Sequence, residues 1–140
     1  MDTRSSRRDF LRLLPALGAL LAVARPAGAA RVARPAAHEH PEPRPGVNAS
    51  KVTPREKLAD ADLARIFDQV REMPHIADGL ACRCGCMEDP AVRSLLSCYE
   101  GDGMASHCMI CQGQAETAYR HFKRGASLAE IRRAVDAEFG

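Results

Sequence analysis

All six cysteines of this 140-residue chain fall within a stretch of thirty residues. They form an alternating Cys-x-Cys-x-Cys run, a single cysteine and a Cys-x-x-Cys pair: Cys82, Cys84, Cys86, Cys98, Cys108 and Cys111. Thiolates bind soft metal ions, form disulfides and exchange electrons. The clustering therefore narrows the chemistry of the protein to these three kinds.

The two motifs offer different geometries for a ligand. We expect Cys108 and Cys111 in the first turn of a helix, where residues i and i+3 share a face and the helix dipole favours a thiolate. In an extended run, residues i and i+2 lie on one side, and a loop curled around Gly85 can bring its sulfurs to one ion. The run is not among the common zinc patterns. An all-thiolate set suits Cu(I) at least as well as zinc.

Three functions follow from the cysteines. The first is binding of a soft metal ion, copper or zinc, by all six thiolates. The second is thiol–disulfide redox chemistry, with Cys108 and Cys111 as the best candidate pair. The third is a disulfide-stapled interaction module, whose pairing the sequence does not select. No Ser/His/Asp arrangement, phosphate loop or specific carboxylate pair occurs, so the sequence does not favour an enzyme.

Methionines and histidines near the cysteines are weaker candidates for ligands. Thioethers bind soft ions, but methionine more often fills a core. Two histidines in a proline-rich segment are expected to be solvated, one follows a proline, and one precedes Cys108. These candidates are Met73, Met87, Met104, Met109, His38, His40, His75 and His107.

The first 29 residues have the features of an export signal. Arg7 and Arg8 lie in a segment that resembles the twin-arginine consensus. The apolar stretch 13–24 that follows is shorter than the roughly 20 residues of a membrane-spanning helix. Ala27-Gly28-Ala29 is a small-x-small cleavage site. We therefore expect the twin-arginine export machinery as a partner, a periplasmic or secreted bacterial protein, and no stable membrane anchor after cleavage.

This route bears on the chemistry of the cysteines, because twin-arginine export carries proteins that have already folded in the cytoplasm. The cytoplasm is reducing, so thiols there are free to take a metal. The route therefore favours a metal or cofactor over a protein that holds only disulfides.

Cleavage after residue 29 would change the charge balance. The whole chain has 20 basic and 18 acidic residues, a net charge of +2. The signal holds five arginines and two aspartates, so 15 basic and 16 acidic residues remain. With no basic field and no tryptophan, the exported part is not expected to bind nucleic acid.

Composition divides the rest of the chain into a linker, 30–52, and a domain, 53–140. The linker is rich in proline and polar residues and is expected to be extended and flexible. In the domain, apolar residues recur at helical spacing and no segment alternates as a strand does. We predict a small all-α domain of four helices with a cysteine-rich loop.

Capping signals place the four helices. We predict helices over 54–72, 90–98 and 107–124, a loop over 74–89, and a last helix that begins after Ser127. Thr53 with Glu56, and Ser127 with Glu130, form capping boxes. Gly125 is the expected left-handed residue at the end of the third helix.

The segments around the cysteines resemble a known family. They comprise 82–86, Cys98-Tyr99, His107-Cys108 with Cys111, and the tail 125–132. They resemble a group of bacterial exported proteins named for a Pro-Cys-Tyr-Cys-Gly-Cys motif, also called the CYCXC family, over about residues 73–140. This sequence departs from the motif at Ala81 and Arg83. Some members are thought to carry selenocysteine, which implies redox or soft-ligand chemistry in the alternating run.

The twin-arginine hypothesis makes a direct prediction. Changing Arg7→Lys together with Arg8→Lys should block translocation, because the export receptor reads the paired arginines. Immunoblots of cell fractions should then show uncleaved precursor inside the cell. Normal maturation of the double variant would exclude this route.

Overall fold

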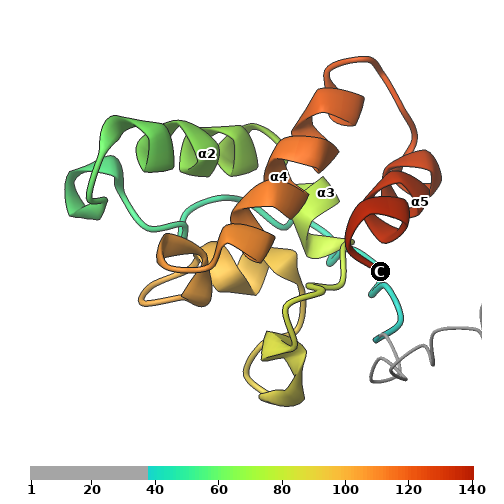
Figure 1. The fold of residues 1–140 in the computed structure, drawn as a ribbon, viewed down its shortest axis with the longest axis horizontal. Helices are drawn as coiled ribbons and strands as arrows, with labels where there is room; N and C mark the ends of the chain where they lie inside the picture. Colours follow the sequence, from blue (N-terminus) through green and yellow to red (C-terminus); the bar gives the residue numbers. More distant parts are fainter. Residues whose placement is uncertain (1–37) are drawn as a thin grey trace, which may run out of the picture. The chain divides into compact units, whose positions relative to one another are not determined.

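Residues 38–140, the part of the chain that the computed structural model describes, contain four α-helices and four short 3-10 helices (Figure 1). The α-helices are α2 (Ala61–Glu72), α3 (Pro74–Asp78), α4 (Met109–Phe122) and α5 (Leu128–Phe139). The 3-10 helices are η1 (Arg55–Lys57), η2 (Cys86–Glu88), η3 (Leu95–Tyr99) and η4 (Met104–Ser106). Within 38–140 the only β pairing is an isolated bridge between Val52 and Glu100. The predicted all-α class is confirmed.

Part of the sequence prediction cannot be compared with this structure. The expected signal peptide, 1–29, and residues 30–37 of the expected linker lie outside the described residues. None of the helices within 38–140 has the length and apolar character needed to cross a bilayer.

Helix α2 begins later than the predicted helix over 54–72. The side chain of Asp60 accepts a hydrogen bond from Leu63 N at 2.8 Å and caps the helix, so α2 starts at Ala61. The predicted capping box at Thr53 does not form. Its hydroxyl instead donates to the backbone carbonyl of Gly101, at 2.6 Å, because this tertiary contact replaces the local one.

The segment between α2 and α4 also differs from prediction. Pro74 opens α3 inside the residues expected to form a loop, since proline suits the first position of a helix. The predicted helix over 90–98 is wrong at its start, because helical structure begins only at Leu95, in η3. Leu95 N donates to Leu80 O at 2.7 Å. This bond ties the residues just after α3 to the beginning of η3.

The C-terminal half follows its local signals. Gly125 has a φ of 76°, the left-handed conformation predicted after α4. Ser127 and Glu130 form the predicted capping box at the start of α5. The prediction for α4 was two residues too long at each end, since the helix runs from Met109 to Phe122.

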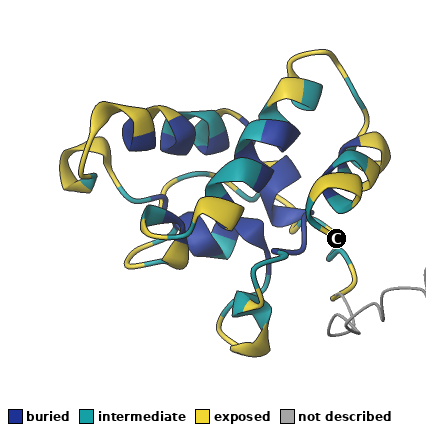
Figure 2. Ribbon diagram, in the orientation of Figure 1, coloured by how far each residue is buried: buried dark blue, intermediate teal, exposed yellow. Residues whose placement is uncertain are grey.

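Helix α4 is central, because it packs against α2 on one side and α5 on the other (Figure 1). The buried residues gather where α2, α3, η3 and α4 face one another (Figure 2). Phe67 of α2 meets Tyr99 of η3 edge to face, with ring centroids 4.7 Å apart. These contacts fix η3, which carries Cys98, against α2.

A fully buried carboxylate, Asp78 at the end of α3, joins three parts of the chain. Its side chain is 0% exposed. Arg44 donates to it from the backbone N at 2.7 Å and from the guanidinium at 2.8 Å. Arg93 and the Ser94 hydroxyl donate at 3.0 Å and 3.2 Å. These donors outweigh burial, which alone would raise the pKa of Asp78, and hold that pKa below its ordinary value.

Residues 38–52, part of the expected flexible linker, pack against the helical unit. Arg44 binds Asp78, and Val52 is buried in the core. His40, which we expected to be solvated, accepts a hydrogen bond from Ala81 N at its Nδ1, 3.0 Å away, and donates from Nε2 to Asp136, also at 3.0 Å. The composition indicated mobility, but Arg44 and His40 bind partners far along the chain, at Asp78, Ala81 and Asp136.

The pairing of the buried Asp78 carboxylate with two arginines leads to a prediction about the stability of the fold. Asp78→Asn should lower the free energy of unfolding by about 3 kcal/mol, because it removes the charge from a buried site that two arginines surround. Urea unfolding followed by circular dichroism measures this. Asp68→Asn is the matched control, since Asp68 also pairs with two arginines but is 35% exposed. Its cost should be about 1 kcal/mol or less. Equal costs for the two variants would contradict the argument.

Candidate metal centre

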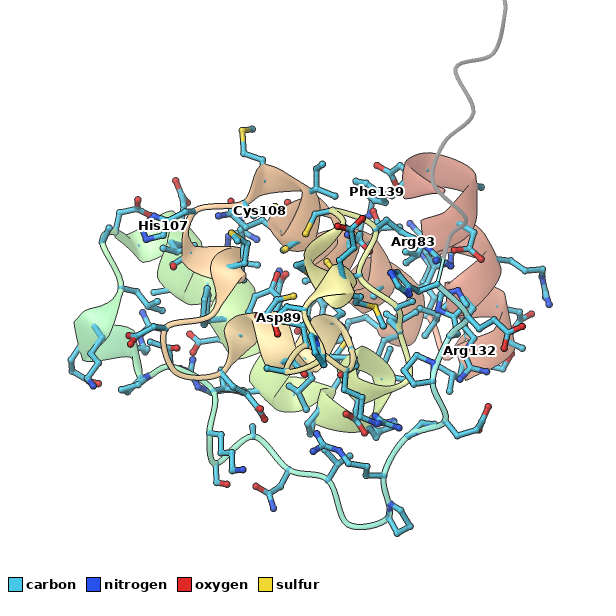
Figure 3. The ribbon with its side chains drawn as sticks, turned by 90° about the horizontal axis from the view of Figure 1, so that it is seen from below. Arg83, Asp89, His107, Cys108, Arg132 and Phe139 are labelled. Atoms are coloured by element: carbon cyan, nitrogen blue, oxygen red, sulfur yellow. The ribbon has the colours of Figure 1, made fainter. Side chains whose placement is uncertain are left out.

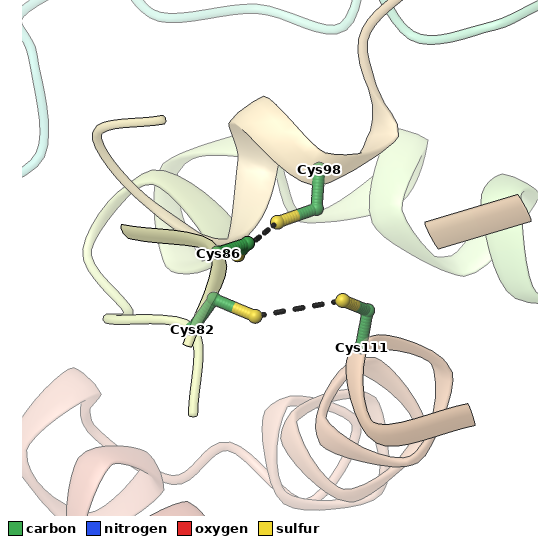
Figure 4. A group of neighbouring side chains, drawn as sticks. All are labelled: Cys82, Cys86, Cys98 and Cys111. Atoms are coloured by element: carbon green, nitrogen blue, oxygen red, sulfur yellow. Dashed lines mark hydrogen bonds between the residues drawn. The ribbon is translucent and has the colours of Figure 1, made fainter. Parts of the chain in front are cut away.

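Four cysteines from three regions of the chain meet in the interior (Figure 4). Their Sγ atoms all lie within 4.8 Å of one another. Cys86 and Cys98 are 3.2 Å apart, and Cys82 and Cys111 are 3.5 Å apart. We call these four residues, Cys82, Cys86, Cys98 and Cys111, the inner set.

The remaining two cysteines, Cys84 and Cys108, form a second group with Cys111. These three Sγ atoms also lie within 4.8 Å of one another. We call Cys84, Cys108 and Cys111 the outer set. The Sγ of Cys84 lies 3.6 Å from that of Cys111 and 3.4 Å from that of Cys82. The expected gathering of all six cysteines is confirmed, while their role as ligands stays a prediction.

The alternating run reaches the cluster because its loop turns sharply. Gly85 has a φ of 87°, a conformation that side chains with a Cβ rarely adopt. Just after it, Cys86 starts η2. Cys82 N donates to the Sδ of Met87 at 3.1 Å, which closes the loop. Curling around Gly85 was predicted from the sequence and is confirmed.

Cys111 is held from the other side by η3. Cys108 is the N-cap of α4 and Cys111 lies one turn into the helix, on the same face. The hydroxyl of the buried Tyr99 donates to Cys111 O at 2.8 Å. The one cysteine that belongs to both sets, Cys111, is therefore held by its backbone as well as by its helix.

Gln114, which the sequence alone did not single out, lies one turn after Cys111 and is fully buried. Its Nε2 faces the Sγ of Cys82 at 3.6 Å, within hydrogen-bonding range of sulfur. Its Oε1 accepts from Arg83 N at 3.0 Å, which orients the amide. The sequence feature that could have pointed to Gln114 is a polar residue on the apolar, cysteine-bearing face of a predicted helix.

The cluster favours one thiolate in particular. Hydrogen bonding with Cys111, the largest influence, lowers the pKa of Cys82 to about 2. The same pair raises the pKa of Cys111, since its proton is shared with the Cys82 sulfur. Burial raises the pKa of both Cys84 and Cys86. The expected preference for a thiolate at Cys111 is therefore wrong, because contacts between the sulfurs outweigh the helix dipole.

The guanidinium of Arg83 binds residues outside the two sets of cysteines. It pairs with Asp136 of α5 at 2.6 Å and contacts His40 Nε2 at 3.1 Å. Figure 3 shows Arg83 on the side of the molecule next to α5. The ion pair between Arg83 and Asp136 therefore attaches the cysteine loop to α5.

The other candidate ligands lie outside both sets. Among the described residues, no histidine belongs to either group of potential ligands. Met73 is buried in the core, and Met104 and Met109 are exposed at 52% and 84%. His107 lies beside Cys108 at the start of α4 (Figure 3).

Comparisons with protein-family models, curated proteins and solved structures gave no match. The resemblance of the cysteine motif to the CYCXC family thus stays a prediction.

The placement of the thiolate can be tested on reduced, metal-free protein. Ultraviolet absorbance should show about one thiolate persisting at about pH 6, below the ordinary cysteine pKa of about 8.5. Cys111→Ala should abolish this signal at that pH, because the hydrogen bond that stabilises the Cys82 thiolate is lost. Cys108→Ala should retain it. A wild-type titration with all six cysteines near their ordinary pKa would contradict this assignment.

Proposed function

We propose that the protein binds a soft metal ion, copper or zinc, through the inner set of thiolates. The observation that carries this proposal is the convergence of four Sγ atoms within 4.8 Å. Two sulfurs bound to one tetrahedral ion at about 2.3 Å are about 3.8 Å apart. The observed separations of 3.2 Å and 3.5 Å require only small shifts to reach that value.

The surroundings of the inner set fit a soft ion. Thiolate ligands select Cu(I) and zinc over hard cations such as magnesium and calcium. Cys82, Cys98 and Cys111 are buried and Cys86 is half-buried, so a bound ion would be largely shielded from water. Metal binding requires deprotonated sulfurs, so the protonated thiols of the set release protons on loading.

The proposed setting is outside the cytoplasm. A protein that folds before twin-arginine export can acquire its ion while its thiols are reduced. Buried thiolates then suit metal handling or storage, since they shield the ion from water.

A second candidate function is thiol–disulfide exchange. The Sγ atoms of Cys86 and Cys98 lie 3.2 Å apart, and Cys86 is half-buried rather than enclosed. Closure of this pair would transfer two electrons and release two protons to an oxidised dithiol partner. Cys86 and Cys98 thus join Cys108 and Cys111 as a second candidate pair for exchange.

Metal competition tests the proposed function. Reduced full-length protein should withdraw Cu(I) or zinc from a chromophoric chelator. Cys86→Ser and Cys98→Ser should each weaken binding about 10-fold or more, about 1.4 kcal/mol, because each removes one ligand of the inner set. Ser97→Ala is the matched control in η3 and should bind as the wild type does.

The outcomes separate the alternatives. Failure of the reduced wild type to take either ion from the chelator would refute metal binding. If protein from its native compartment then shows a disulfide that opens near the potential of that compartment, exchange is supported. Disulfides that resist reduction there would indicate a stapled interaction module.

A further inference from the structure

The six cysteines outnumber the ligands that one ion can use. A tetrahedral ion takes four thiolates, and the inner set supplies these. Cys84 and Cys108 would then remain beside the loaded site with no ion of their own. The structure gives them a common neighbour, however, since each lies within 4.8 Å of the Cys111 sulfur and of the other.

Resting on the function proposed above, we propose that the cluster is a two-ion centre in which Cys111 Sγ bridges an inner and an outer metal subsite. The inner subsite consists of the inner set, and the outer subsite consists of Cys84, Cys108 and Cys111. A thiolate sulfur has more than one lone pair and can bind two soft ions at once. The shared residue is the one whose backbone Tyr99 holds in place.

Distances support the outer subsite. In a three-coordinate site with metal–sulfur bonds of about 2.3 Å, two sulfurs are about 4 Å apart. The Cys84 and Cys111 sulfurs are already 3.6 Å apart. Cys108 and Cys111 share a face of α4, and Cys84 reaches them from the loop around Gly85. One helix and one loop thus supply all three sulfurs.

The two subsites differ in exposure and therefore in ligand class. The inner subsite has three buried cysteines, whereas Cys84 and Cys108 of the outer subsite are half-buried. Three thiolates, two of them half-buried, match the trigonal coordination that Cu(I) accepts. Zinc, which takes four ligands, would need a further ligand there. The geometry thus points to a second Cu(I) in a more exchangeable position than the first.

Binding of Cu(I) to the two subsites requires no oxidant or reductant. Each Cu(I) arrives as Cu(I) from a soft donor and remains in that oxidation state. Each protonated thiol that becomes a ligand loses its proton to solvent as its bond to copper forms.

Native mass spectrometry of the full-length reduced protein, titrated with Cu(I) in the presence of a competing chelator, tests this centre. The wild type should hold two copper ions per chain. Cys84→Ser and Cys108→Ser should each hold one, since the inner subsite remains complete. Met109→Leu, which removes an exposed sulfur beside Cys108, is the matched control and should hold two.

A second measurement needs no variant. Cadmium NMR of the wild type loaded with cadmium in place of copper should give two signals with scalar coupling through the shared sulfur. A wild type that binds any other number of ions above zero, or two uncoupled cadmium signals, would overturn the bridged centre while leaving metal binding intact. A wild type that binds no ion would refute the proposed function itself.

Discussion

The compensation of the Asp78 charge is the constraint on which the rest of the structure depends. A carboxylate that is 0% exposed is tolerated only with several donors, and these come from the N-terminal segment through Arg44 and from the residues before η3 through Arg93 and Ser94. Asp78 also ends α3, a few residues before the alternating cysteines. The position of Asp78 therefore fixes where the cysteine loop begins and where η3 places Cys98.

Around this anchor, the sulfur cluster is assembled from elements that could not form it separately. The loop that contains Gly85 contributes three cysteines, η3 contributes one, and the start of α4 contributes two. Two side chains connect these elements. The amide of Gln114 faces the Cys82 sulfur, and the hydroxyl of Tyr99 donates to the Cys111 carbonyl. The pKa values of Cys82 and Cys111 consequently depend on the assembled cluster more than on the position of either residue in the sequence.

The sequence was informative wherever the deciding interaction is local. Ser127 with Glu130 and the left-handed Gly125 involve neighbours within a few residues, and both were predicted correctly. Thr53 carries the same kind of capping signal, but a carbonyl 48 residues away captures its hydroxyl. His40 looked like a solvated linker residue for the same reason, since its partner is distant in sequence. In the site, the spacing predicted that the cysteines gather, whereas the division into inner and outer sets depends on how α4 and η3 pack.

The contact between His40 and Asp136 spans 96 residues of the chain. At a synthesis rate of about 5–20 residues per second, about 5–20 s separate the appearance of the two partners on the ribosome. Until Asp136 is made, the histidine ring and, once it has been added, the Arg83 guanidinium lack the carboxylate that they later share. Because Arg83 belongs to the cysteine loop, the loop stays unanchored on this side until α5 has been made. The nascent chain therefore presents its first three cysteines before the structure that encloses them exists.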